Sequence, residues 1–504
     1  MAFHTARRTA FALPILASLL GGTAARADLT AEQVWQSWQD YYTSVGGSID
    51  AGSTERAGDT LTLGDVTMTL SGPEGTTTAT LDRVRMIEQR GAVQVMLPAS
   101  IPLVTSGTSE KGETVESRMT ATQSGLDLRV SGNPDAIAYD MAADSIAATL
   151  DQVTVDGKPL EMTMRATAHR ATARAMMAGQ DDRAIDYSSA ADRVDFAMDV
   201  TDPENGGTFG ITGDVAQVTG GGAMRQPAGT TDLKDMTAAL AAGLTVEGRY
   251  SYGESRMDFA LDDAGNSAKG SLASQSGTGS MSMTGAALDY RLENAGNTIH
   301  LEGAQIPFPV DLSLGRMVAG LGLPLSDTGA AQPFHLETRL IDLTVNDAVW
   351  ALIDPQASLP RDPATLIVDL KGMAKVMGNL LMPDPASPPD AVPGEIEALD
   401  LNELKLTIAG AALTGKGAFT FDNSDMTTFE GMPRPEGAVD LHLLGGNGLL
   451  DKLIALGLLP AEQGMGVRMM AGLFAKSGPG EDELSSRIEV RPDGGLYANG
   501  QRLR

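Results

Sequence analysis

The chain contains no cysteine among its 504 residues. This absence excludes disulfide bonds, thiolate metal sites and cysteine nucleophiles together. Beyond the first 27 residues, no stretch reaches the roughly 18 consecutive apolar residues that mark a membrane-spanning helix. We therefore expect packing and backbone hydrogen bonds alone to hold the fold, and we expect no transmembrane span in the mature chain.

Positive charge is also scarce. Lys and Arg total 37 against 65 Asp and Glu, which gives a formal net charge of -28. A protein that binds phosphates needs a cluster of Lys and Arg residues, and the sequence contains no such cluster. The composition thus argues against nucleic acid as a partner and is typical of a soluble exported protein.

Motifs for catalysis are missing as well. The five histidines, His4, His169, His300, His335 and His442, are scattered without an H-E-x-x-H pairing, and G-x-S-x-G, S-x-x-K and calcium-loop patterns are absent. His335 and His442 each stand between two apolar residues, which predicts the polar face of a strand. We predict no catalytic residue, cofactor or metal site, and hence no enzyme. A carboxylate pair assembled from distant strands, as in a glycan hydrolase, stays open.

The first 27 residues, MAFHTARRTAFALPILASLLGGTAARA, have the form of a secretory signal peptide. Arg7 and Arg8 precede an apolar run of about 10 residues, which is too short to span a bilayer, and Ala25 to Ala27 form a small-residue cleavage site. Cleavage after Ala27 predicts a periplasmic protein. Losing the three arginines of this segment changes the formal charge from -28 to -31.

The remainder is written mostly in short alternating runs separated by Gly, Asn and Asp. Residues 66 to 70, 127 to 130 and 366 to 370 alternate cleanly, as do 195 to 200, 209 to 213, 256 to 261, 334 to 340 and 484 to 490. Each run buries one side only, as antiparallel strands do. The fold class expected is mainly β (α+β): a long, curved, predominantly antiparallel sheet or β-groove with a few packed amphipathic helices.

Helical spacing appears at a few places. Thr30 and Gln33 form a capping box ahead of AEQVWQSWQDYYTSV, whose aromatic face is expected to dock on the sheet, with an exposed aromatic platform as the alternative. Shorter helices are expected at 233 to 240 and 347 to 353. Near the C-terminus, 447 to 475 predicts a helix pair with Asn447 as the first N-cap. We expect this pair to be buried, with a movable lid as the alternative.

The segment MPDPASPPDAVPG, residues 382 to 394, carries five prolines and predicts a linker or loop. It divides the expected β-rich region 28 to 381 from a C-terminal β module at 395 to 504, although both parts are compatible with one elongated domain.

The stretch GAALTGKG, residues 410 to 417, is one residue short of a phosphate-binding loop. Such a loop needs a hydroxyl after the lysine and a helix behind it, whereas Gly417 follows Lys416 and the next residues alternate as a strand. We therefore exclude a nucleotide partner. Gly415 and Gly417 should lie on the apolar face, where missing side chains permit curvature or close approach of another backbone.

Several of these segments together show a family resemblance. The runs RDPATLIVDLKG, IEALDLNELKLTIAGAALTGKGAFTFDNSD, LLDKLIALGLLP and YANGQRL, with AEQVWQSWQDYY and IPFP, resemble a family of exported alphaproteobacterial proteins, the domain of unknown function 2125. That family implies no catalytic residue. More distantly, the C-terminal module is similar to AsmA-like envelope proteins, which implies a β-groove that shields acyl chains. AsmA-like proteins generally carry a membrane anchor where this chain has a cleavable signal.

These features predict a non-enzymatic periplasmic protein that binds a lipid or other apolar ligand on a curved sheet and serves envelope maintenance. The alternative is an envelope scaffold or protein-interaction module with a filled β core and an envelope protein as its partner. An open apolar groove would favour the first, and a closed core the second.

Overall fold

The computed structural model describes residues 29–504 except 45, 73–74, 110–111, 180–181, 204, 229–235, 264–265, 379 and 381–393. The predicted signal peptide and nearly all of the proline-rich segment lie outside the described residues, as does the start of the helix expected at 233 to 240. The strands β20 and β21 on either side of the proline-rich segment pair with each other.

The described chain is mainly β, with one 27-stranded antiparallel sheet, as the sequence predicts. The strands are β1 (Gly47–Ala57), β2 (Thr60–Gly72), β3 (Gly75–Gln89), β4 (Ala92–Met96), β5 (Ser100–Thr108), β6 (Thr114–Ser124), β7 (Asp127–Asn133), β8 (Ala136–Val155), β9 (Lys158–Leu160), β10 (Met162–Ala178), β11 (Arg183–Thr201), β12 (Thr208–Gln226), β13 (Thr245–Tyr252), β14 (Ser255–Asp263), β15 (Asn266–Ser274), β16 (Ser276–Met283), β17 (Ala287–Gly303), β18 (Val310–Pro324), β19 (Gln332–Val345), β20 (Ala364–Val376), β21 (Gly394–Ile408), β22 (Ala411–Asp422), β23 (Arg434–Leu444), β24 (Lys476–Ser477), β25 (Glu483–Val490), β26 (Leu496–Ala498) and β27 (Gln501–Arg502). The helices are α1 (Ala31–Ser44), α2 (Met236–Ala241), α3 (Asp347–Ile353), α4 (Gly446–Ala455) and α5 (Ala461–Phe474).

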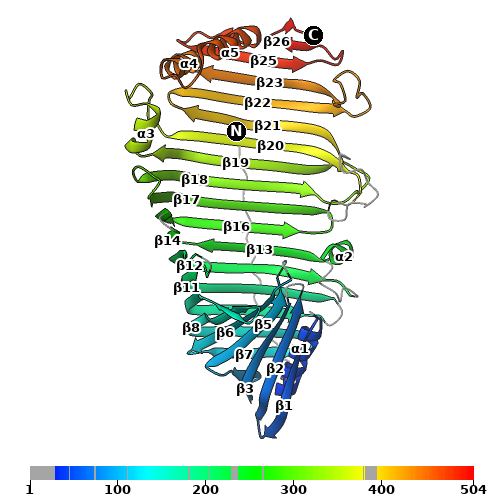
Figure 1. Ribbon diagram of the computed structural model, residues 1–504. Coiled ribbons are helices and arrows are strands. Elements are labelled where there is room, and N and C mark those ends of the chain that lie inside the picture. The colour runs from blue at the N-terminus through cyan, green and yellow to red at the C-terminus, as the bar shows by residue number, and fades with distance from the viewer. Residues whose placement is uncertain are drawn as a thin grey trace, which may run out of the picture.

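The topology is a meander, in which each long strand pairs with the next along the chain. Four long strands each face two shorter strands in line: β4 and β5 lie beside β3, β6 and β7 beside β8, β13 and β14 beside β12, and β15 and β16 beside β17. Figure 1 shows the strands from β11 onward stacked as a ladder, while β1 to β7 cross one end of it at a steep angle. Short connections between sequence neighbours account for this simple order.

A filled core exists at the N-terminal end. Helix α1 begins with the predicted capping box: the backbone N–H of Thr30 donates to the Gln33 side chain at 2.9 Å, and that of Gln33 donates to the Thr30 hydroxyl at 3.2 Å. The helix buries Val34 and packs Trp35 and Trp38 against a core built from β1 to β4, β7 and β8. The docking prediction for this aromatic face is thus confirmed.

In the middle of the long strands, the alternation of apolar side chains shifts by one residue. Leu340 and Leu343 on β19 both lie on the apolar face, opposite Met317 and Leu314 of β18, because Asp342 between them has a left-handed backbone with φ 58. Such a residue interrupts the pleat and bends the strand. The same shift occurs at a set of residues that we call the left-handed row: Asp65 (φ 52), Gly125 (φ 63), Arg170 (φ 47), Gln217 (φ 51), Gly296 (φ 62) and Asp342.

The residues opposite this row on the neighbouring strands are small or polar. A Cβ on Gly315 would lie 3.3 Å from the Cβ of Asp342, and one on Gly253 would lie 3.5 Å from that of Gln217. Arg170 instead forms an ion pair with Asp192. The neighbouring strand therefore leaves room for each left-handed residue. The pairing register of β19 with β18 is the same on both sides of Asp342, whereas its register with β20 shifts between Leu340 and Leu343.

Gly415 and Gly417 lie on the apolar face of β22, opposite Leu441 and Val439 of β23. A Cβ on Gly417 would stand 2.8 Å from the carbonyl oxygen of Ala438. Close approach of the neighbouring backbone is therefore the reason for this glycine. The turn before β22 contains only Ala409 and Gly410, both left-handed (φ 48 and 84).

The C-terminal helix pair differs from expectation in two ways. Helix α4 is N-capped by Gly445 rather than Asn447, because the carboxylate of Asp482 accepts from the backbone N–H groups of Asn447 and Gly448 at 3.1 and 2.7 Å. The expected burial is also wrong. Helix α4 has no buried residue, and α5 buries only Gly464 while its Met469 is 74% exposed.

We predict that Gly417→Val lowers the free energy of unfolding by about 1–3 kcal/mol, since the added side chain overlaps the β23 backbone. Urea denaturation followed by circular dichroism measures this. Lys416→Ala, on the solvated face one residue earlier, should change it by less than about 0.5 kcal/mol. Equal effects of the two substitutions would contradict this account of β22.

Asp342 offers a test of the left-handed row. Asp342→Val places a β-branched residue at φ 58 and should cost about 1–2 kcal/mol of stability. Asp342→Gly, which adopts this conformation without strain, should cost little or nothing. If thermal unfolding shows the two variants equally stable, the backbone conformation of Asp342 does not have the role given to it here.

Candidate functional site

One face of the sheet carries apolar side chains in rows that cross the strands. In one row, Tyr290, Leu321, Leu336, Leu370 and Leu401 lie directly opposite one another on β17 to β21. Directly opposed residues of antiparallel strands share a face. We call this surface, from β11 to β25, the apolar face.

Much of the apolar face is open to solvent. Eleven of its large hydrophobic side chains are at least 37% exposed: Tyr187, Tyr250, Leu261, Met281, Tyr290, Ile299, Leu336, Leu343, Ile396, Leu406 and Ile408. Monomeric soluble proteins rarely expose a contiguous apolar surface that crosses this many strands. Its extent marks it as the candidate binding surface of the molecule.

Helices cover the apolar face only toward its ends. Helix α1 packs on the first strands, before this surface begins, and α2 packs on Met224, Val246 and Met283 at one side. Figure 1 shows α3, α4 and α5 beside the ends of the strands rather than across them. Between these helices, the described part of the chain leaves the apolar face uncovered.

Aromatic rings lie over glycines of the neighbouring strand on this face. The ring of Phe259 approaches within 2.7 Å of the place where a Cβ would stand on Gly270, and the ring of Phe334 within 2.5 Å of that on Gly372. A larger residue at either glycine would push the ring away from the sheet. In these pairs the large rings lie flat against the backbone of the neighbouring strand and project little from the sheet.

An open pocket of ≈ 740 Å³ lies at the strand ends beside the loop 304–309. Phe209, Leu261 and Phe308 give it apolar walls, and Lys269 with Asp199 adds charge at its margin. The loop contains the IPFP motif of the sequence, so this segment helps to line a cavity next to the open surface.

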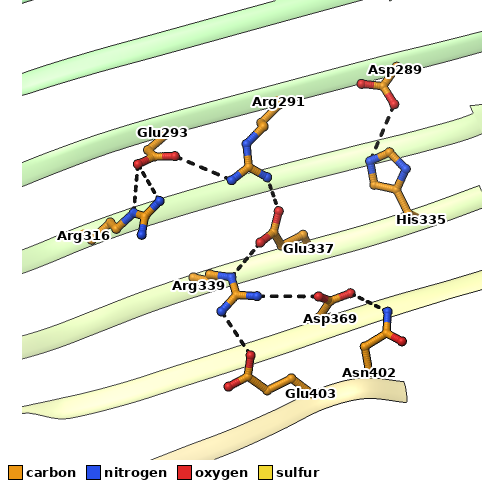
Figure 2. Close-up of polar contacts among 10 residues, drawn as sticks. All are labelled: Asp289, Arg291, Glu293, Arg316, His335, Glu337, Arg339, Asp369, Asn402 and Glu403. Carbon is orange, nitrogen blue, oxygen red and sulfur yellow. Dashed lines mark hydrogen bonds and ion pairs between the residues drawn. The ribbon is translucent and has the colours of Figure 1, made fainter. Parts of the chain in front are cut away.

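The opposite face is polar and carries a connected set of ion pairs, which Figure 2 shows across β17 to β21. Glu337 accepts from Arg291 and, at 2.6 Å, from Arg339. Arg339 reaches on to Glu403 at 3.1 Å and to Asp369 at 3.5 Å. Glu337 and Arg339 both lie on β19, whereas the other pairs connect different strands: Arg291 ties β17 to β19, and Arg339 ties β19 to β20 and β21. The network therefore favours one pairing register and keeps this face solvated.

Glu337 is the most buried carboxylate of that network. Its side chain is 17% exposed. Burial by itself raises the pKa of Glu337, but hydrogen bonds from Arg339 and Arg291 outweigh it and hold the pKa below its usual range. The group is therefore charged at neutral pH and serves as a structural anion.

The histidines of the described chain pair with carboxylates on the polar side of the strands. His442 lies 2.8 Å from Glu483, and His335 lies 3.7 Å from Asp289, as Figure 2 shows for the second pair. Both positions confirm the polar face expected for them. Among the described residues, no group of three or more His, Asp or Glu is arranged to hold a metal ion.

Lys416 also lies on the polar side, in β22, where it lines a shallow pocket with Lys405, Asp440 and Arg487. No helix follows it, and β22 continues to Asp422. The backbone around Lys416 is thus committed to strand pairing and offers no loop of free amides to a phosphate.

None of the helices in the described part of the chain is both long and apolar enough to cross a membrane. Comparison with known proteins adds nothing to the geometry: no family model, curated protein or solved structure matches the chain.

Sequence reasoning located many strands of the apolar face but not its continuity. The missed signal is the three-residue spacing of apolar residues at mid-strand, such as Leu63 to Val66 and Leu340 to Leu343, with a polar residue between them. Read as one longer strand with a shifted alternation, each such pair of runs places the alternating apolar residues before and after the shift on one face.

Glu337→Gln should lower the free energy of unfolding at pH 7 by about 1–2 kcal/mol, because Arg291 and Arg339 lose their shared anion. Since the folded-state pKa of Glu337 is depressed, its contribution is present above the ordinary Glu pKa and is lost as the pH falls below it. The deficit of the variant should therefore shrink in acid.

Urea denaturation at pH 7 and pH 4 measures this. Asp186→Asn, which removes an exposed partner of Arg225, is the matched control and should cost less than about 0.5 kcal/mol. A Glu337→Gln deficit that does not diminish in acid would show that the carboxylate charge is not what stabilises this part of the sheet.

Proposed function

We propose that this protein is a non-enzymatic binding protein that holds the acyl chains of a lipid, or another elongated apolar ligand, on the apolar face of its sheet. The observation that carries the proposal is the open apolar row from β17 to β21, which consists of Tyr290 and four leucines on paired antiparallel strands. Covering such a surface lowers the free energy of the system by about 25 cal/mol per Å² of apolar area removed from water.

Two further features support a lipid as the ligand. The rows run across the strands. An extended hydrocarbon chain of the ligand that lies along a row therefore contacts an apolar side chain at each strand and passes no charged group. The polar network on the opposite face keeps the protein itself dissolved. The predicted export to the periplasm would place this surface in the envelope, where such ligands move between membranes.

The alternative is a scaffold with a filled β core and an envelope protein partner. The filled core around Val34 and Trp38 is the observation in its favour, but it occupies only the first strands and α1. A scaffold of this kind would take up no hydrocarbon, which makes the two functions distinguishable by one titration.

The test is a fluorescence titration of the mature protein with diphenylhexatriene, a neutral hydrocarbon that emits strongly only out of water. We expect saturable binding. Leu336→Asn, in the middle of the aliphatic row and 41% exposed, should weaken it about tenfold, because a buried contact of the ligand becomes polar.

Lys371→Asn is the control, since Lys371 lies on the other side of the sheet opposite His335 of the neighbouring strand. This variant should bind like the unmodified protein. Absence of saturable binding in the unmodified protein, or equal weakening by both substitutions, would reject the apolar face as the binding surface.

A further inference from the structure

Half of the chain's eight tyrosines gather at one place on the apolar face. Tyr187 of β11 and Tyr290 of β17 lie in one row, with Gly222, Gly248 and Met281 between them. In the neighbouring row, Tyr250 of β13 lies between Gly220 and Gly279, and Tyr252 lies opposite Gly277 in the next. We call these four residues the tyrosine cluster.

Glycines form the floor of this cluster. The ring of Tyr250 lies within 2.2 Å of where a Cβ would stand on Gly279, and that of Tyr187 within 2.9 Å of the corresponding place on Gly222. Tyr250 and Tyr252 are stacked, with ring centroids 6.5 Å apart. The rings therefore lie against the backbone, and the hydroxyls of Tyr187 and Tyr250 also lie over the glycines, 2.9 and 2.8 Å from where a Cβ would stand on Gly222 and Gly279.

Three of the four hydroxyls have no acceptor among the residues that the structure describes. Tyr252 donates to the side-chain oxygen of Asn294 at 2.9 Å. Within the described chain, no acceptor is in hydrogen-bond range of the hydroxyls of Tyr187, Tyr250 and Tyr290, and these side chains are 47%, 44% and 38% exposed. Each hydroxyl is a free donor on an otherwise apolar surface.

The charge of the surrounding residues restricts which acceptor groups of a ligand can bind these hydroxyls. The rows through the cluster contain no Asp, Glu, Lys, Arg or His from β11 to β25, and the chain as a whole carries a net charge of -28. A phosphate or carboxylate would find no cation to pair with here and would be repelled by the net charge. An uncharged oxygen acceptor, such as an ester carbonyl, meets neither penalty.

We propose that the tyrosine cluster is the subsite for the uncharged ester groups of a neutral acylglycerol, whose acyl chains extend along the aliphatic rows toward β21. The inference rests on the proposed lipid-binding function and names its ligand class. From Tyr290 on β17 to Leu401 on β21 the row crosses four strand spacings, about 19 Å, which accommodates an extended acyl chain.

The test uses the triple variant Tyr187→Phe, Tyr250→Phe, Tyr290→Phe, which keeps every ring and removes three hydroxyls. Dioleoylglycerol is titrated against bound diphenylhexatriene, with dioleoyl phosphatidic acid as the charged counterpart of the same chain length. The triple variant should bind diphenylhexatriene with unchanged affinity and dioleoylglycerol about tenfold or more weakly, since each lost hydrogen bond lowers affinity severalfold. Tyr497→Phe, whose ring lies under Arg491 far along the sheet, is the control and should behave like the unmodified protein.

The outcomes separate the two proposals. If the unmodified protein binds no diphenylhexatriene, the proposed function fails and the subsite fails with it. If it binds the hydrocarbon but the triple variant holds dioleoylglycerol as tightly as before, only the tyrosine subsite is overturned. Tighter binding of phosphatidic acid than of dioleoylglycerol to the unmodified protein would overturn the uncharged ligand class.

Discussion

The pairing of each strand with its sequence neighbour, in a register that keeps apolar residues opposite apolar residues, is the constraint on which the rest of the structure depends. In the β17 to β21 rows, a slip of one residue would turn Leu321, Leu336 and Leu370 to the charged face. The ion pairs that connect Glu337 to Arg291, and Arg339 to Asp369 and Glu403, favour the same register from the other side. Both faces therefore specify one alignment, although the larger of the two core clusters in the described chain lies at the first strands and the other is small.

That arrangement explains how a long single sheet can be stable while most of its apolar face stays open. The backbone hydrogen bonds are satisfied between strands, and aromatic rings that lie over glycines recover part of the burial that a second layer would give. The left-handed row then bends the strands without changing which side is apolar. Stability and an accessible apolar surface arise from the same pattern.

Much of the fold follows from the sequence, because alternation and capping are local. The runs at 66 to 70, 334 to 340 and 484 to 490 are strands, and Thr30 with Gln33 caps α1 as predicted. The prediction of Asn447 as the N-cap of α4 was wrong because Asp482, distant in the chain, accepts the hydrogen bonds of the first backbone N–H groups of the helix. The tyrosine cluster was missed for a similar reason: Tyr187 and Tyr290 share a face only through the register of the strands between them. The exposure of α5 depends on its neighbours, which periodicity does not report.

The central claim is that the apolar face is covered by a lipid in the working protein. The most direct measurement is mass spectrometry of the organic extract of the mature protein, purified without detergent after export. We predict a lipid that co-purifies at a near-stoichiometric ratio and is lost from the Leu336→Asn variant. A lipid-free preparation that also takes up no fluorescent fatty acid would contradict the account.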